Sequence, residues 1–129
     1  MPPTATRIGQ INLVMIPFTD QDRSIEFYAQ TLGFEKRTDV PFGQSYRWVE
    51  VYPPSGTTGI ALAPPREGDP VGIHTGISLT TDDIDATHAQ LLSSGVDVDA
   101  EVARMGEPVP PMFWFRDPDA NTLLIVEQR

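Results

Sequence analysis

One acidic-to-glycine segment occurs twice in this chain, and the offset from Asp20 to Asp82 is 62 residues. Asp20–Gly33 reads DQDRSIEFYAQTLG, and Asp82–Gly95 reads DDIDATHAQLLSSG. Each segment follows an apolar run suited to a strand, Ile11–Phe18 in the first copy and Ile73–Thr80 in the second. In a chain of 129 residues, this repeat indicates two copies of one supersecondary unit rather than a long solenoid. Two units that each present a half-buried sheet can enclose a cavity between them.

Each repeat is predicted to contain a helix that begins at its acidic residue and ends at its glycine. Asp20 and Asp82 are suited to accept hydrogen bonds from the free amides of a first helical turn. Gly33 and Gly95 suit the left-handed conformation that ends many helices. Apolar positions at helical spacing predict the buried stripes, which are Ile25, Tyr28, Ala29 and Leu32 in the first helix and Ile84, His88, Leu91 and Leu92 in the second.

Two segments alternate between a uniform apolar face and a mixed face, as half-buried strands do. Tyr46–Tyr52 places Val49 and Val51 on one face, and Met112–Arg116 places Phe113 and Phe115 on one face. We expect these apolar faces to meet helices and the opposite faces to meet the cavity. The predicted organisation is a single α+β domain over 1–129, with module one at about 8–63, a linker at about 64–72 and module two at about 73–129.

Composition limits the classes of partner. The chain has 18 acidic and 9 basic residues, and a formal charge of −9 repels nucleic acid. No apolar run approaches the roughly 18 residues that a membrane span needs. The absence of cysteine excludes disulfides and cysteine-ligated metals. Met1–Thr6 has no apolar core typical of a signal peptide, so a cytoplasmic location is expected.

Three segments together resemble the vicinal oxygen chelate superfamily, which contains glyoxalases, bleomycin resistance proteins and extradiol dioxygenases. They are Asp22–Phe34 (DRSIEFYAQTLGF), Ile77–Asp85 (ISLTTDDID) and Phe115–Glu127 (FRDPDANTLLIVE). The resemblance implies two βαβββ modules related by a pseudo-twofold axis, which form an incomplete barrel, usually within a homodimer. It does not imply one reaction, because members of this superfamily share a scaffold and not a chemistry.

The resemblance also implies four positions at which enzymes of the family hold a divalent metal through His, Gln or Glu. In this chain these positions align with Leu13, Ala61, Gly76 and Leu124. None of the four side chains carries a donor atom, whereas a catalytic divalent ion needs several imidazole or carboxylate ligands. We therefore expect no metal cofactor at these positions. A divalent metal held by other residues is the remaining alternative.

A few residues remain candidates for chemistry. His74 is expected on the cavity side, either as a displaced ligand or acid–base group or as a polar residue at the start of a strand. Glu50 lies between aromatic residues, and it is either a base, a partner for a cationic ligand, or a solvated carboxylate that pairs with Arg116. His88 is expected on the second helix in a packing or surface role.

The leading hypothesis is a metal-free protein that binds a hydrophobic or cationic aromatic molecule. Trp48 and Trp114 offer flat surfaces for such a ligand, unless they serve only as core residues. The alternative is a glyoxalase-type lyase or isomerase, or a dioxygenase, that uses Glu50 and His74. A third possibility is an accessory protein that works through its dimer face. The predicted cavity lining is Leu13, Met15, Trp48, Glu50, Tyr52, His74, Met112, Trp114, Arg116 and Leu124.

The first strand predicts the mode of assembly. Ile11–Phe18 is apolar on both faces and only Pro17 interrupts it, so its edge needs a cover. We expect a C2 homodimer whose interface buries more than roughly 1,000 Å² and whose partner completes the cavity wall.

Overall fold

The computed structural model of the chain describes residues 6–128 and contains two mixed sheets of four strands each. The first sheet and its helices comprise β1 (Leu13–Ile16), α1 (Gln21–Glu26), the π-helix η1 (Phe27–Thr31), β2 (Glu35–Phe42), β3 (Tyr46–Tyr52) and β4 (Gly59–Leu62). The second comprises β5 (His74–Thr81), α2 (Ile84–Ser93), β6 (Asp97–Val98), β7 (Met112–Arg116) and β8 (Thr122–Glu127).

Both sheets have the same topology. The strand order is β1-β4-β3-β2 in the first sheet and β5-β8-β7-β6 in the second. In each sheet the first strand runs parallel to the last one, and the remaining pairs are antiparallel. The α+β class and the duplicated βαβββ unit predicted from the repeat are therefore confirmed.

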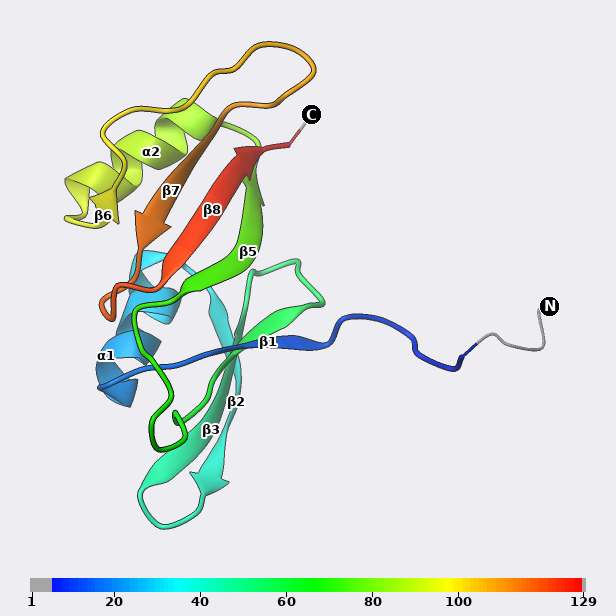
Figure 1. Cartoon of the computed structure of the whole chain (residues 1–129), viewed down its shortest axis with the longest axis vertical. Helices are drawn as coiled ribbons and strands as arrows, with labels where there is room; N and C mark the ends of the chain where they lie inside the picture. The colour runs from blue at the N-terminus through cyan, green and yellow to red at the C-terminus, as the bar shows by residue number, and fades with distance from the viewer. Residues whose placement is uncertain (1–5, 129) are drawn as a thin grey trace.

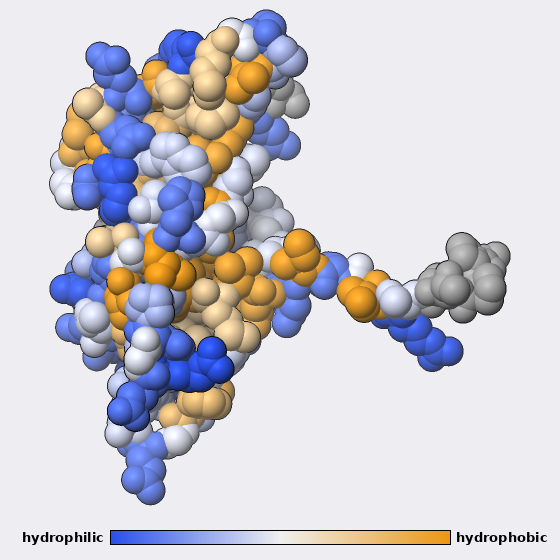
Figure 2. Space-filling view, in the orientation of Figure 1, coloured by the Kyte–Doolittle hydropathy of each residue, from blue (hydrophilic) through white to orange (hydrophobic). Residues whose placement is uncertain are grey.

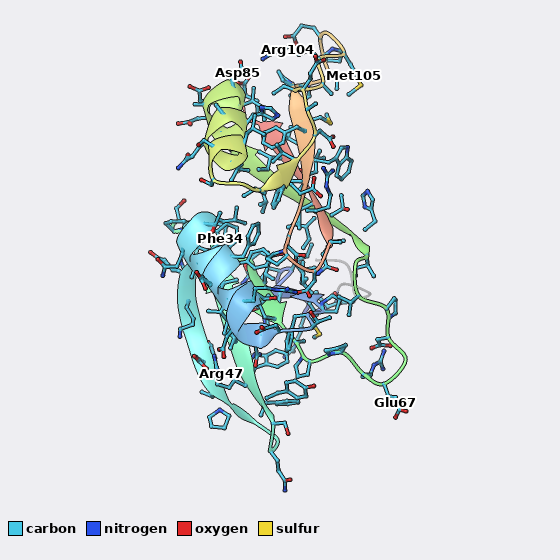
Figure 3. The ribbon with its side chains drawn as sticks, turned by 90° about the vertical axis from the view of Figure 1, so that its left-hand side faces the viewer. Phe34, Arg47, Glu67, Asp85, Arg104 and Met105 are labelled. Atoms are coloured by element: carbon cyan, nitrogen blue, oxygen red, sulfur yellow. The ribbon has the colours of Figure 1, made fainter. Side chains whose placement is uncertain are left out.

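The two sheets follow one another along the long axis of the molecule, and α1 and α2 lie on the same side of them (Figure 1). Figure 3, which looks from that side, shows both helices in front of the strands. Among residues 6–128, no helix covers the opposite face of either sheet. A single chain therefore leaves the space over these two faces open instead of enclosing it.

The hydrophobic core lies between the sheets and the helices. Val49 and Val51 of β3 and Phe113 and Phe115 of β7 are fully buried there, as the alternation predicts. The ring of Phe27 in η1 lies 6.3 Å from that of Phe115, so the first helix also contacts the second sheet. One core thus spans both repeats, which fixes the two open faces relative to each other.

The two helices are not identical copies, and this corrects one predicted cap. Asp20 caps α1, where it accepts from the amide of Arg23, but α2 is capped by Asp83, which accepts from Ala86, and not by Asp82. Thirteen positions separate Asp20 from Gly33 and twelve separate Asp83 from Gly95. The π-helix η1 accommodates the additional residue, since a π turn inserts one residue into a helix.

Two further predictions need correction. Leu92 belongs to the predicted stripe of the second helix, yet it is 56% exposed, while Ile84 and Leu91 of that stripe are buried. The first strand is shorter than Ile11–Phe18, because only Leu13–Ile16 pairs with β4.

The segment Met1–Thr6, which was considered as a signal peptide, lies outside the described residues except for Thr6. No helix in 6–128 is long and apolar enough to cross a membrane.

A buried polar network joins the turn between β7 and β8 to the first repeat. The carboxylate of Asp119 accepts from the amide and hydroxyl of Thr19, from the hydroxyl of Ser24 and from Arg23, at 2.5–3.0 Å. The Asp119 side chain is 1% exposed, whereas that of Arg23 is 48% exposed. Burial alone raises the pKa of Asp119, but the hydrogen bonds from Thr19 and Ser24 and the charge of Arg23 outweigh it and lower that pKa.

The same turn contributes two more bonds to the first repeat. The hydroxyl of Tyr28 donates to Asp117 at 2.8 Å, and the amide nitrogen of Asn121 donates to the carbonyl of Pro17 at 2.9 Å. Burial, followed by the nearby charges of Asp117 and Asp119, raises the pKa of Tyr28 far above its usual value. We call Asp117, Asp119 and Asn121 the turn network, and it holds the two repeats together.

Candidate functional site

The uncovered side of the first sheet, which we call the first open face, displays five of the ten predicted cavity residues. In the register of the sheet, Ala61 of β4 lies opposite Met15 of β1 and Glu50 of β3. Directly opposed residues share a face, so these three side chains form one row across the sheet. Leu13 pairs with Gly59 in the next row, and Trp48 and Tyr52 flank Glu50 on β3. Met15 is 63% exposed, so this face is open to solvent.

Glu50 is held in place by its two aromatic neighbours. The indole Nε1 of Trp48 donates to one carboxylate oxygen at 2.7 Å, and the hydroxyl of Tyr52 donates to the other at 2.8 Å. The bond to Glu50, followed by partial desolvation, raises the pKa of Tyr52. Each oxygen of the carboxylate thus has a donor before any ligand arrives.

Gly59 and Arg37 explain why Tyr52 can take this position. A Cβ atom at position 59 would lie 2.6 Å from the Tyr52 ring, so only glycine leaves room for the ring to lie over β4. The guanidinium of Arg37 lies 4.5 Å from the centre of the same ring, within the range of a cation–π contact. Tyr52 therefore packs as a fixed element of the face.

The uncovered side of the second sheet, the second open face, displays the other five predicted residues. Trp114 pairs with Leu124 across β7 and β8, and its ring lies 4.7 Å from that of His74, edge to face. Met112 and Arg116 lie on the same face of β7. Arg116 bonds Asp97 and Asp99 at 2.8 Å each, and these bonds raise the pKa of its guanidinium.

These contacts decide between some of the alternatives left open by the sequence. Glu50 bonds Trp48 and Tyr52, and Arg116 bonds two aspartates, so the pair between Glu50 and Arg116 is not formed within the chain. His88 lies edge-on to Phe113 at 4.9 Å between ring centres, and its Nε2 is 2.7 Å from the carbonyl of Asp99. His88 therefore packs against the core.

The four positions that the resemblance implies for metal ligands carry no side-chain ligand in this chain. Leu13, Ala61, Gly76 and Leu124 offer no side-chain donor atom, and Gly76 lies at a break in the β5–β8 register with a φ of 74°. Among residues 6–128, no group of three or more His, Asp or Glu side chains is placed to hold an ion. Glu50 and His74, which the enzymatic alternative requires, lie on different sheets.

A hollow of about 660 Å³ lies at one end of the first open face. Only Met15 and Trp48 of the ten predicted residues line it. The other lining residues were not predicted, and they come from the end of β1, the end of β2 and the segment that joins β4 to β5. Those residues are Ile16, Pro17, Phe42, Ala63, Pro64, Pro65, Arg66, Asp69, Pro70 and Ile73.

Comparison with known proteins agrees with this architecture. YurT of Bacillus subtilis (strain 168) is 30% identical over 119 residues, which cover 84% of this chain and 91% of the relative. A superfamily member from Sphaerobacter thermophilus is 35% identical, with a TM-score of 0.87 over 95% of this chain and all of that one. TnmS3, an antibiotic binding protein from Streptomyces sp. CB03234, is 31% identical, with a TM-score of 0.82 over 97% of this chain and 100% of that one. The sequence profile of the Glyoxalase/Bleomycin resistance protein/Dioxygenase superfamily matches residues 10–125, and this chain belongs to that superfamily.

Proposed function

We propose that this protein binds a small hydrophobic or cationic aromatic molecule on its open faces and does so without a metal. One observation carries the proposal. Where enzymes of the family present a polar, metal-holding centre, this chain has Leu13 and the fully buried Ala61, on a face that also bears Met15 and Trp48. Such a surface favours burial of an apolar ligand over coordination of an oxyanion.

Two further observations support a binding role. The solved structure of TnmS3, 31% identical to this chain, is that of an antibiotic binding protein. Each open face also carries one of the two tryptophans of the chain, Trp48 on the first and Trp114 on the second. Flat, rigid indoles give a ligand a large contact area at a low entropic cost.

We also propose that a second copy of the chain covers the open faces, in a C2 homodimer. Exposed apolar side chains support this: Met15 on the first face is 63% exposed, and Ile8 and Ile11 on the preceding segment are 82% and 70% exposed. Figure 2 shows this apolar surface where β1 leaves the body, and Figure 1 shows the segment extending away from the body. Apolar surface of this kind is typical of contact sites.

The assembly is tested by light scattering at micromolar concentration, where we expect a mass of twice 14.2 kDa. Met15→Asp places a charge on the proposed interface and should shift the protein toward the monomer. Met105→Asp, at a loop position that is also exposed, is the matched control and should leave the mass unchanged. A monomer mass for the unmodified protein contradicts the dimer.

The binding role is tested by tryptophan fluorescence against a broad panel of hydrophobic and cationic aromatic compounds. Trp48→Phe leaves only Trp114 as a reporter, and Trp114→Phe leaves only Trp48, so the two faces are read separately. We expect a saturable response from at least one compound. The absence of a saturable response across the panel, with both indoles intact, contradicts the proposed function.

A further inference from the structure

We propose that the hollow beside Trp48 is a subsite for the ring system of the ligand, and that it selects an uncharged planar aromatic group over a charged one. This inference rests on the proposed function and narrows it, because that function admits both hydrophobic and cationic ligands.

The hollow lies where the end of the first open face meets the loop between β4 and β5. Its volume of about 660 Å³ is in the range of sites that take a drug-sized molecule. Trp48 of β3 and Phe42 of β2 contribute aromatic surface, with ring centres 5.8 Å apart and planes inclined by 49°. Met15 of β1 adds a flexible thioether, which adapts well to aromatic rings.

Much of the remaining lining comes from proline residues. Pro64, Pro65 and Pro70 of the loop line the hollow together with Pro17 at the end of β1. Proline has no amide hydrogen, so these four positions add apolar ring surface but no backbone donor. This lining suits the face of a flat hydrocarbon ring better than a group that needs hydrogen bonds.

The charges around the hollow are already paired. Arg66 and Asp69 of the lining bond each other, with 3.2 Å between the guanidinium Nε and the carboxylate. The indole NH of Trp48 is engaged by Glu50, and the second oxygen of Glu50 is engaged by Tyr52. Among the described residues that line the hollow, none offers an unpaired charge to a ligand. A charged ring would lose its hydration without gaining a counter-ion, which is unfavourable.

Three flat tricyclic probes of similar size and different charge test this inference. They are acridine, which is uncharged at pH 8, 10-methylacridinium, which is a permanent cation, and 9-anthracenecarboxylate, which is an anion. Isothermal titration calorimetry on the full-length protein measures each affinity. We expect acridine to bind about ten-fold tighter than either ion, a difference of about 1.4 kcal/mol.

Variants locate the binding. Phe42→Ala removes one wall, and Ala63→Leu fills part of the hollow; each should weaken acridine about ten-fold. Met105→Ala removes an equally exposed apolar side chain from a loop of the second repeat, far from the first sheet in Figure 3, and should have no effect.

The outcomes separate this inference from the function on which it rests. If acridine binds but is weakened only by Trp114→Phe, and not by Phe42→Ala or Ala63→Leu, the ligand lies elsewhere and the subsite is contradicted while the binding role stands. If the cation binds as tightly as acridine, the proposed selectivity is wrong. If none of the three probes binds, the subsite is contradicted, and the broad fluorescence panel alone decides the binding role.

Discussion

The turn between β3 and β4 and the turn between β7 and β8 occupy equivalent places in the two repeats, yet they differ in what they contact. The second turn, Asp117–Asn121, buries its two aspartates and its asparagine against the first repeat. The first turn reads Pro53–Thr57 (PPSGT), with Ser55 exposed where the second turn has Asp119. The second turn therefore connects the repeats through buried side-chain hydrogen bonds, whereas Ser55 of the first turn is exposed.

The two open faces differ in a complementary way. The first sheet has a long outer strand, β2, of eight residues, and its face carries the hollow beside Trp48. The second sheet ends in β6, which has two residues, and its face is crossed by the ion pairs of Arg116. The repeat that supplies the connecting turn thus has the shorter outer strand and the ion pairs of Arg116, and the other repeat has the longer outer strand and the hollow.

The largest effect is expected at Asp119. Asp119→Ala leaves the Ser24 hydroxyl and the Thr19 amide without their acceptor at the contact between the repeats, and should cost about 3 kcal/mol of unfolding free energy. Ser55→Ala, the equivalent change in the first repeat, should cost less than about 0.5 kcal/mol because Ser55 is exposed. Urea unfolding measures both. Equal costs would contradict the difference between the turns.

Acidification should remove the contribution of the Asp119 carboxylate to the stability of the fold. Its pKa is lowered in the fold, so its stabilisation is present above the usual carboxyl pKa of about 4 and is lost as pH falls through the folded value. The difference in unfolding free energy between the unmodified protein and Asp119→Ala should therefore be constant from pH 5 upward and narrow below about pH 4. A constant difference down to pH 2 would show that the charge of Asp119 does not matter.

Tyr28 should limit stability at the alkaline end. Its pKa is raised by burial, so the fold favours the neutral phenol, and this stabilisation is lost as pH rises above the unfolded value of about 10. Tyr28→Phe should cost about 1.5 kcal/mol at pH 7, because it removes the bond to Asp117. Above about pH 10 the difference in unfolding free energy between the unmodified protein and Tyr28→Phe should shrink by about 1.4 kcal/mol per pH unit. A difference in unfolding free energy that is the same at pH 11 as at pH 7 would contradict the burial of this hydroxyl.

The smallest effect distinguishes the backbones of the two turns. Ala120 has a φ of 63°, which costs a non-glycine residue about 1 kcal/mol, so Ala120→Gly should stabilise the protein by about 0.5 kcal/mol. The equivalent residue, Gly56, is not in this conformation, and a Cβ atom there would lie 3.1 Å from the ring of Pro53, so Gly56→Ala should not stabilise the protein. Thermal unfolding of both variants measures the difference. Destabilisation by Ala120→Gly would contradict the inference that the backbone of Ala120 is strained.

The repeat predicted the fold well because its signals are local. Alternation in Tyr46–Tyr52 and Met112–Arg116 was sufficient to assign Val49, Val51, Phe113 and Phe115 to the core. The cap at Asp83 was missed because the π turn η1 adds a residue to only one repeat, and the equal spacing of Asp20 and Asp82 concealed it. Exposed Leu92 shows that helical spacing alone does not define the packed side.

The site was harder to predict than the core. Alternation placed Trp48 and Glu50 on an uncovered face, but it could not show that their side chains bond each other. The hollow depends on Phe42 and on Pro64–Pro70, which approach Trp48 only through tertiary folding. The turn network was equally hidden, because Thr19 and Asp119 are 100 residues apart in sequence. Contacts of this kind carry no local pattern.

We propose above all that ligand binding by this protein needs no metal. The most direct test is calorimetry with the tightest compound from the fluorescence panel, on protein whose metal content is measured before and after dialysis against EDTA. We predict the same dissociation constant within about two-fold in both samples, because the proposed binding face carries Leu13 and Ala61 at the positions where the resemblance implies metal ligands. Binding that is lost with the chelator and restored by one equivalent of zinc, nickel, manganese or iron would contradict the account.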